Sequence, residues 1–160
     1  MTRITVIAVG KIKENYLREA ASEYGKRLGK YCKLSLIEVD DEKTLWQDSE
    51  AINEQILKKE AQRILHHIKP DTYTISLEIK GKPMNSETFA AYIDKLAVGG
   101  KSHLTFIIGG SLGLHESVSK KADLALSFSK LTFPHQLMRV ILLEQIYRAF
   151  RINQGEPYHK

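Results

Sequence analysis

The stretch Leu104-Thr105-Phe106-Ile107-Ile108-Gly109-Gly110-Ser111-Leu112-Gly113 decides the fold. Its first half is an uncharged, mostly apolar run, which predicts a buried strand over His103–Ile108. The glycines that follow predict a loop at the end of this strand. A second short strand is predicted over Leu124–Phe128, and it leads into Ser129-Lys130-Leu131-Thr132-Phe133-Pro134. Two strand-end loops so close in sequence can build one pocket from backbone groups.

Working outward, the hydrophobic pattern of the remaining chain alternates between strand and helix spacing. The other strands are predicted over Arg3–Val9, Lys33–Val39 and Tyr73–Ile79. The helices are predicted over Leu17–Leu28, over Ile52–Ile68, from an N-cap at Ser86 to Leu96, and from Pro134 to Ile152. The pattern assigns no element to Trp46. This mostly regular alternation of strands and helices predicts an α/β fold with a three-layer, mostly parallel sheet, formed by one domain over residues 1–160.

The last predicted helix is apolar on nearly every side. A helix that packs on one face of a sheet needs a single apolar stripe, so this one needs a second burial partner. A homodimer interface is one such partner, and a two-fold interface is the commonest kind in small proteins. The other interpretation is a helix buried deep within its own fold.

Composition excludes several classes of protein. With 42% hydrophobic and 27% charged residues the chain resembles an ordinary globular protein, and no apolar run reaches the roughly 20 residues of a membrane helix. Cys32 is the only cysteine and no signal-peptide pattern opens the chain, so we expect a cytoplasmic protein. The net charge of +5 is uneven, with seven Lys or Arg and three acids over Lys11–Lys33. This distribution suits a polyanion such as RNA, or else an ordinary solvated surface.

Several familiar motifs are absent. The glycines at 109, 110 and 113 do not match the G-x-G-x-x-G of dinucleotide-binding proteins. Gly100-Lys101-Ser102 lacks the earlier glycine of a phosphate loop and precedes a strand instead of following one. No Cys/His spacing fits zinc, and the adjacent His66 and His67 point about 100° apart on a helix. We therefore expect no metal site.

The two strand-end loops remain as the candidate site. In open α/β sheets ligands bind beyond the carboxyl ends of the strands. Gly109 and Gly110 have no side chain to block a ligand, and the loop from Phe128 to Phe133 offers backbone groups that can read an adenine edge. The alternative is that both segments are ordinary turns.

Motifs along nearly the whole chain resemble the RlmH family of the SPOUT class of methyltransferases. They include the opening Ile-Ala-Val-Gly-Lys, the Phe106–Ser111 run, Leu126–Ser129 and Thr132–His135. The likeness continues in the last helix and in the terminal tail, through Arg139, Glu144-Gln145, Tyr147-Arg148-Ala149-Phe150 and Tyr158-His159-Lys160.

This resemblance implies S-adenosylmethionine as cofactor, a homodimer and a C-terminal trefoil knot, which general topology rules would not predict. The implied reaction is methylation of N3 of a pseudouridine in the helix-69 loop of 23S ribosomal RNA within the assembled 70S ribosome. By match to the family, the cofactor-binding residues are Leu77, Gly109, Gly110, Phe128, Ser129, Lys130, Leu131, Thr132, Phe133 and Pro134.

The resemblance also directs attention to the tail as the catalytic region. We hypothesise that Tyr158 stacks on the target base, that His159 accepts or relays the N3 proton, and that Arg148 stabilises the anionic ring. Arg139 and Lys160 are expected to bind RNA. The family resemblance also implies that, in the dimer, the tail of one subunit lies near the cofactor of the other. The alternatives are a frayed terminal His159 and an Arg148 paired with Glu144 along the helix.

Two other functional classes stay open on the sequence. One is a non-catalytic ribosome-binding assembly factor that keeps the pocket as a relic, which basic patches and a dimer would serve equally well. The other is a small nucleotide-binding α/β protein, which the absence of a phosphate loop and of a dinucleotide fingerprint disfavours.

Overall fold

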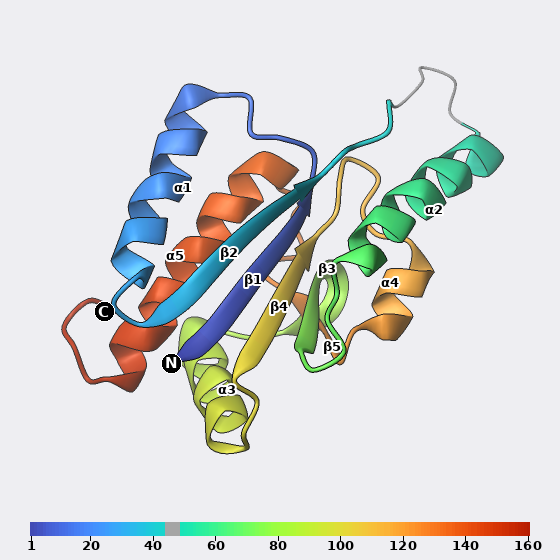
Figure 1. The fold of residues 1–160 in the computed structure, drawn as a ribbon. Coiled ribbons are helices and arrows are strands. Elements are labelled where there is room, and N and C mark those ends of the chain that lie inside the picture. The colour runs from blue at the N-terminus through green and yellow to red at the C-terminus, as the bar shows by residue number, and fades with distance from the viewer. Residues whose placement is uncertain (44–48) are drawn as a thin grey trace.

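Five parallel strands form one sheet in the order β2-β1-β4-β3-β5, with helices on both faces (Figure 1). This computed structural model describes residues 1–43 and 49–160, so Trp46 lies outside the described residues. The strands are β1 (Thr2–Val9), β2 (Cys32–Val39), β3 (Tyr73–Pro83), β4 (His103–Ile108) and β5 (Leu124–Ser127). The helices are α1 (Asn15–Leu28), α2 (Glu50–His66), α3 (Ser86–Val98), α4 (Glu116–Lys121) and α5 (His135–Asn153). The predicted α/β alternation and parallel sheet are confirmed.

Strand β4 lies at the centre of the sheet, between β1 and β3, and all six of its residues are buried. Its side chains alternate between two cores. Leu104, Phe106 and Ile108 belong to the larger core beneath α1, α3 and α5, whereas Ile107 belongs to the smaller core beneath α2 and α4. Because both faces of the strand are covered, even its polar residues His103 and Thr105 are buried.

The apolar residues around α5 are partly explained within one chain. Helix α5 packs against both α1 and α3 while it covers the sheet, and Leu142, Leu143, Ile146 and Ala149 are buried there. The remaining apolar residues of the helix are only half-buried, which are Leu137, Met138, Val140, Ile141, Tyr147, Phe150 and Ile152. The homodimer stays a prediction. None of the helices in the described part of the chain is long and apolar enough to cross a membrane.

Two boundaries differ from the sequence prediction. Strand β3 continues past Ile79 to Pro83, because Lys82 and Pro83 pair with β5 after a register shift. The α3 N-cap is Asn85 and not Ser86, since the Asn85 side chain accepts a hydrogen bond from Thr88 N at 2.7 Å. Neighbouring Asn and Ser are both good caps, so sequence alone does not separate them. The trefoil knot stays a prediction.

His103 gives the fold a testable pH dependence. Its ring is 6% exposed and bonds Thr5 Oγ1 at 2.9 Å. Burial lowers the pKa of His103 below its ordinary value of 6.5, so the unfolded chain binds the proton more readily than the folded one. This group should therefore cost stability as the pH falls below about 6.5, by at most about 1.4 kcal/mol per pH unit. Urea unfolding across pH should show a shallower slope for His103→Gln, and an identical slope would contradict this role.

Candidate active site

The sheet brings three of the predicted cofactor-binding residues to one edge. Leu77 is paired with Leu126, and the pairing of β3 with β4 places Gly109 just past the same level. Phe128 directly follows the end of β5. The carboxyl ends of β4 and β5 therefore meet the middle of β3 here, and open α/β sheets bind their ligands beyond the carboxyl ends of their strands.

The glycine loop after β4 is a tight turn closed on itself. Gly113 N donates to Gly110 O at 3.0 Å, and a Cβ on Gly109 would overlap the carbonyl group of Gly113. A Cβ on Gly110 would meet the Val9 side chain at 3.1 Å and Glu60 Oε1 at 3.4 Å. The sequence explanation, that these glycines leave room for a ligand, is therefore corrected: the space is taken by the protein itself.

This geometry predicts that Gly109→Ala is strongly destabilising. The added methyl group would collide with backbone that no rotamer change can move, and overpacking of this kind costs about 1–3 kcal/mol. Gly25→Ala in α1 is the matched control, because its Cβ would meet nothing closer than Leu34 Cδ2 at 3.8 Å. Helix propensity should make that change stabilising by about 0.5–1 kcal/mol. Urea denaturation of both variants measures the difference, and equal stability would contradict the described turn.

The loop between β5 and α5 is held by its own hydrogen bonds. Ser127 Oγ donates to Ser129 O at 3.1 Å, and Ser129 Oγ accepts from Leu131 N at 2.9 Å. Leu131 is 71% exposed, and Lys130 and Thr132 are exposed as well. The loop ends at Pro134, the N-cap of α5. Its conformation is therefore set before any ligand arrives.

A cavity of about 400 Å³ opens beside this loop, which is within the usual range for a small-molecule site. Its apolar wall carries Phe89, Phe128 and Phe133, and its polar wall comes from α3 and α5. The lining residues are Met84, Asn85, Ser86, Glu87, Phe89, Leu126, Phe128, Phe133, Ile141 and Gln145. Of the predicted cofactor residues only Phe128 and Phe133 are among them. Leu77, the two glycines and the rest of the loop lie outside this lining.

The structure brings together the three predicted catalytic residues. Tyr158 OH donates to Glu144 Oε2 at 2.7 Å, and Arg148 donates to the same carboxylate at 2.8 Å. The Arg148 guanidinium also lies 4.8 Å from the centre of the Tyr158 ring. The Glu144–Arg148 ion pair foreseen as an alternative is thus present, but it is part of a larger arrangement. We call Glu87, Glu144, Arg148, Tyr158 and His159 the tail cluster.

His159 links the tail cluster to the cavity. Arg148 NH1 donates to His159 Nδ1 at 2.9 Å, and His159 Nε2 lies 2.6 Å from Glu87 Oε1. Because a guanidinium has only donors, Nδ1 accepts and Nε2 carries the proton that bonds Glu87. This hydrogen bond lowers the pKa of Glu87, which also lines the cavity. His159 is therefore held from both sides, and a frayed terminal histidine does not describe it.

Tyr158 anchors the tail instead of presenting a free ring. Burial first, and the hydrogen bond to Glu144 second, raise the pKa of Tyr158, so the phenol stays protonated. Its ring meets Tyr147 edge-on at 5.0 Å, and Arg148 already covers one ring face. One face of the Tyr158 ring is therefore occupied within the protein, and stacking of the target base on this ring stays a prediction.

Arg139 is an internal residue. It is 5% exposed, and its guanidinium donates to Glu38 Oε2 at 2.6 Å, to Gly10 O at 2.6 Å and to Val9 O at 3.0 Å. The structure argues against RNA contact, because both terminal nitrogens are used inside the protein. Lys160 is exposed at the end of the chain and stays a candidate for RNA binding.

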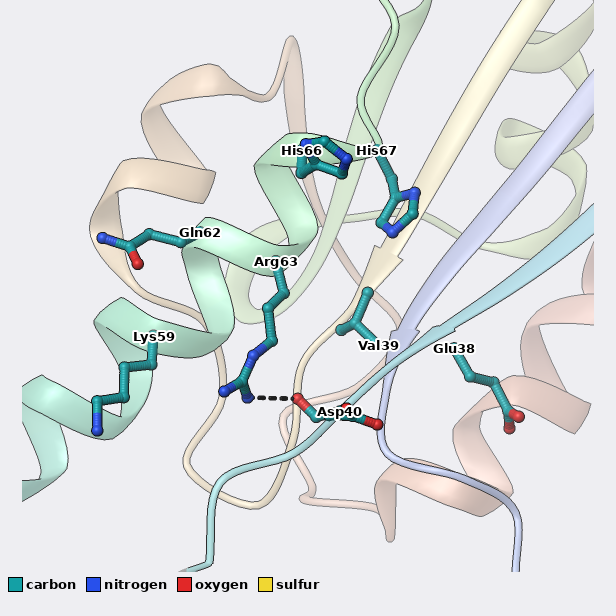
Figure 2. A pocket seen from close by; sticks show the side chains of 8 residues that line it. All are labelled: Glu38, Val39, Asp40, Lys59, Gln62, Arg63, His66 and His67. Atoms are coloured by element: carbon teal, nitrogen blue, oxygen red, sulfur yellow. Dashed lines mark hydrogen bonds between the residues drawn. The ribbon is translucent and has the colours of Figure 1, made fainter.

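Figure 2 shows another cavity, of about 560 Å³, between the end of α2 and the end of β2. Arg63 donates to Asp40 O at 2.8 Å there and pairs with Glu42 at 3.3 Å, as does Lys59 at 3.5 Å. His66 and His67 are exposed, as expected. Among the residues that the structure describes, no three His, Cys, Asp or Glu side chains are grouped to hold a metal ion. With its cations already paired, this cavity is a weak candidate for an anion site.

Two residues of the site were not among the predicted site residues. Glu87 and Gln145 line the cavity, and Ser86 Oγ donates to Gln145 Oε1 at 2.7 Å. Glu87 and His159 are 72 positions apart, so no local spacing pattern connects them. Gln145 is in a quoted motif of the family resemblance, but its role follows only from the packing of α3 on α5.

Comparison of the sequence with known proteins identifies the family of the chain. A family model described as "Predicted SPOUT methyltransferase" matches residues 2–159. The "Ribosomal RNA large subunit methyltransferase H" of Bifidobacterium adolescentis is 60% identical over 158 residues, which is 99% of either chain. The protein of the same name from Clostridium acetobutylicum is 56% identical over 157 residues, covering 98% of this chain and 99% of that one.

The fold has a solved counterpart at much lower identity. A structure titled a probable methylase family protein, from Haemophilus influenzae Rd KW20, superposes with a TM-score of 0.54 at 14% identity. The match covers 99% of this chain and 70% of that one, and it bears on the fold alone. Since the family model spans nearly the whole chain and the relatives above are more than half identical to it, the chain belongs to the SPOUT methyltransferase family.

Proposed function

We propose that this protein methylates N3 of a pseudouridine in the helix-69 loop of 23S ribosomal RNA, in the assembled 70S ribosome, with S-adenosylmethionine as donor. The relatives named above support ribosomal RNA as the substrate class. The observation that carries the proposal is the position of Glu87, which lines the cavity and bonds His159 at 2.6 Å. A donor pocket and a proton-accepting tail thereby form one site.

The residues around the cavity fit the proposed cofactor. Phe128 and Phe133 provide an apolar wall for an adenosine or a thioether chain, and Glu87 offers a carboxylate that suits a cationic amino or sulfonium group. Neighbouring Leu77 and Gly109 lie at the same sheet edge, within reach of a ligand that extends beyond the cavity. The cofactor, when bound, supplies an already activated methyl group.

The tail cluster is proposed to remove the N3 proton. A uracil-type N3–H is weakly acidic, so a base of moderate strength assists its loss. His159 Nδ1 is the unprotonated nitrogen and currently accepts from Arg148. Exchange of that contact for the substrate N3–H would let Nδ1 take the proton, while Glu87 stabilises the resulting imidazolium through Nε2–H. The released N–H of Arg148 then faces the ring anion, and Glu144 keeps the guanidinium in place.

The cellular setting is proposed as a cytoplasmic homodimer acting on a large particle. A chain of 160 residues has little surface with which to read a long RNA, so the shape and charge of the assembled ribosome must supply much of the recognition. In this proposal the tail serves the cavity of its own chain, because His159 bonds Glu87 of the same chain, and the exchange of tails between subunits that the family resemblance implies is a separate expectation. Naked RNA should therefore be a poor substrate.

The test is methyl transfer from labelled S-adenosylmethionine to purified 70S ribosomes that lack the modification, beside separated subunits and naked 23S RNA. We expect label on one pseudouridine and only in the assembled ribosome. Efficient labelling of a short naked hairpin would contradict the requirement for the particle. Cofactor binding without any transfer would replace the proposal with a non-catalytic assembly factor.

A further inference from the structure

A second groove runs between α1 and the sheet, away from the cavity described above. It has a volume of about 590 Å³, and its lining comes from β1, β2, α1 and α5. Val6, Ala8 and Leu143 form a buried apolar floor, and each is at most 2% exposed. Leu36 on the edge strand β2 forms an open wall and is 53% exposed. The groove is large enough for a nucleoside and is apolar at its base.

Two cations line this groove without an acidic partner. Lys11 and Arg18 contribute to its lining, and within residues 1–43 and 49–160 neither is paired with a carboxylate. The one acid in the lining, Glu38, is occupied by Arg139 at 2.6 Å and by Ile12 N at 3.2 Å. The groove therefore presents an apolar floor with net positive charge at its edge, which complements an anion that carries an apolar group.

The surface beside the groove is also basic. Helix α1 runs alongside β2 (Figure 1), and its last turn carries Lys26 and Arg27, followed by exposed Lys30 and Lys33. Tyr16 at the start of the helix is 68% exposed. Tyr16 lies at the start of α1, two residues from Arg18, while the other cations lie at its far end, where Arg27 pairs with Glu23 at 2.8 Å. Surfaces that bind single-stranded nucleic acids combine cations with aromatic rings. A polyanion that enters the groove would thus continue along α1.

One hydrogen bond joins the segment beside the groove to the start of α5. Lys13 N donates to Gln136 Oε1 at 3.0 Å, and Lys13 directly follows the lining residue Ile12. Gln136 lies in the first turn of α5, two residues after Pro134 at the end of the β5–α5 loop.

We propose that this groove binds an unpaired nucleotide of the RNA substrate, with the base on the apolar floor and the adjoining phosphates at Lys11 and Arg18. Proteins read RNA chiefly through splayed, unstacked nucleotides, and phosphate contacts supply most of the affinity. The inference rests on the proposed function, since it names a second contact between the same enzyme and its RNA. The groove is thereby a specific RNA-binding surface, which the composition of the chain does not locate.

The first test reverses the two charges. The Lys11→Glu/Arg18→Glu variant should bind a fluorescein-labelled single-stranded oligouridylate about tenfold more weakly than the wild type, with a shallower dependence on salt. Lys95→Glu/Lys101→Glu is the matched control, because it makes the same change in charge at exposed residues of α3 and the following loop. The control should bind within about twofold of the wild type. Equal weakening of both variants would overturn the site, since net charge alone would then explain binding.

The second test fills the groove without changing charge. Ser22 is exposed and lines the groove, so Ser22→Trp should block the base and weaken oligouridylate binding by a similar factor. Ser35→Trp, at an exposed position of β2 outside the lining, should have little effect. Normal binding by Ser22→Trp would overturn nucleotide insertion. So would a change in oligomeric state without a loss of RNA affinity, which would identify the groove as a contact between two copies.

Methyl-transfer kinetics separate this inference from the proposed function. The groove variants should raise KM for the ribosomal substrate and leave kcat and cofactor affinity unchanged. If the wild type transfers methyl groups and the variants keep its KM, the groove proposal is wrong and the function stands. If the wild type transfers no methyl groups but the groove variants still bind the labelled oligouridylate more weakly than the wild type does, the proposed function is wrong and the groove proposal stands.

Discussion

The His159→Ala variant is expected to lower kcat for methyl transfer by about a hundred- to ten-thousandfold, the usual contribution of a positioned acid or base. Cofactor affinity should stay near that of the wild type, because His159 does not line the cavity. The tail should also stay in place, since Tyr158 remains bonded to Glu144 at 2.7 Å. Single-turnover transfer and calorimetric cofactor binding measure the two quantities separately.

Glu87→Gln is the matched control for this prediction. Its amide oxygen can still accept from His159 Nε2–H, but it no longer carries the charge that stabilises an imidazolium. We expect a smaller loss of kcat, about tenfold, and unchanged folding. A parallel loss of activity, cofactor affinity and stability in His159→Ala would instead show that the histidine has a structural role.

Arg139→Leu is expected to destabilise the fold by about 3 kcal/mol, the scale for removal of one partner from a buried pair. The change would leave the carbonyl groups of Val9 and Gly10 without their donor, and Glu38 without its cation. Because Arg139 joins the start of α5 to the ends of β1 and β2, cofactor affinity should fall as well. Urea denaturation gives the stability change.

Glu38→Gln tests which of these contacts matters. The Glu38 side chain is 39% exposed, so its loss should cost only about 1 kcal/mol while both carbonyl contacts survive. A loss below 1 kcal/mol for Arg139→Leu would contradict the internal role and return Arg139 to the RNA-binding candidates.

Much of the fold follows from local patterns in the sequence. The buried strand His103–Ile108 is evident because the run is uncharged and mostly apolar, and the turn after it is evident because glycines follow the strand. The structure gives Gly113 of that turn a φ of +85°, which few other residues adopt. The extension of β3 to Pro83 is not evident, because Lys80-Gly81-Lys82-Pro83 has turn composition. Its pairing with β5 is a tertiary effect, and local propensity yields to it.

The site is less accessible to sequence reasoning than the fold. A basic residue within the apolar helix α5 is compatible with RNA binding or with an internal ion pair, and only the structure shows that Arg139 is buried. The Glu87–His159 contact joins the start of α3 to the end of the chain. The two residues are 72 positions apart, and patterns of hydrophobic spacing do not predict contacts between residues so far apart in sequence. The family resemblance identified the tail residues, whereas the structure shows that Glu144 and Glu87 hold them.

The most direct test of the central claim, that cavity and tail form one site, is a crystal structure with S-adenosylhomocysteine. We expect the ligand against Phe128 and Phe133, with its sulfur directed toward the Glu87–His159 pair of the same chain. A ligand bound in the cavity of Figure 2, or in the groove beside α1, would contradict the account.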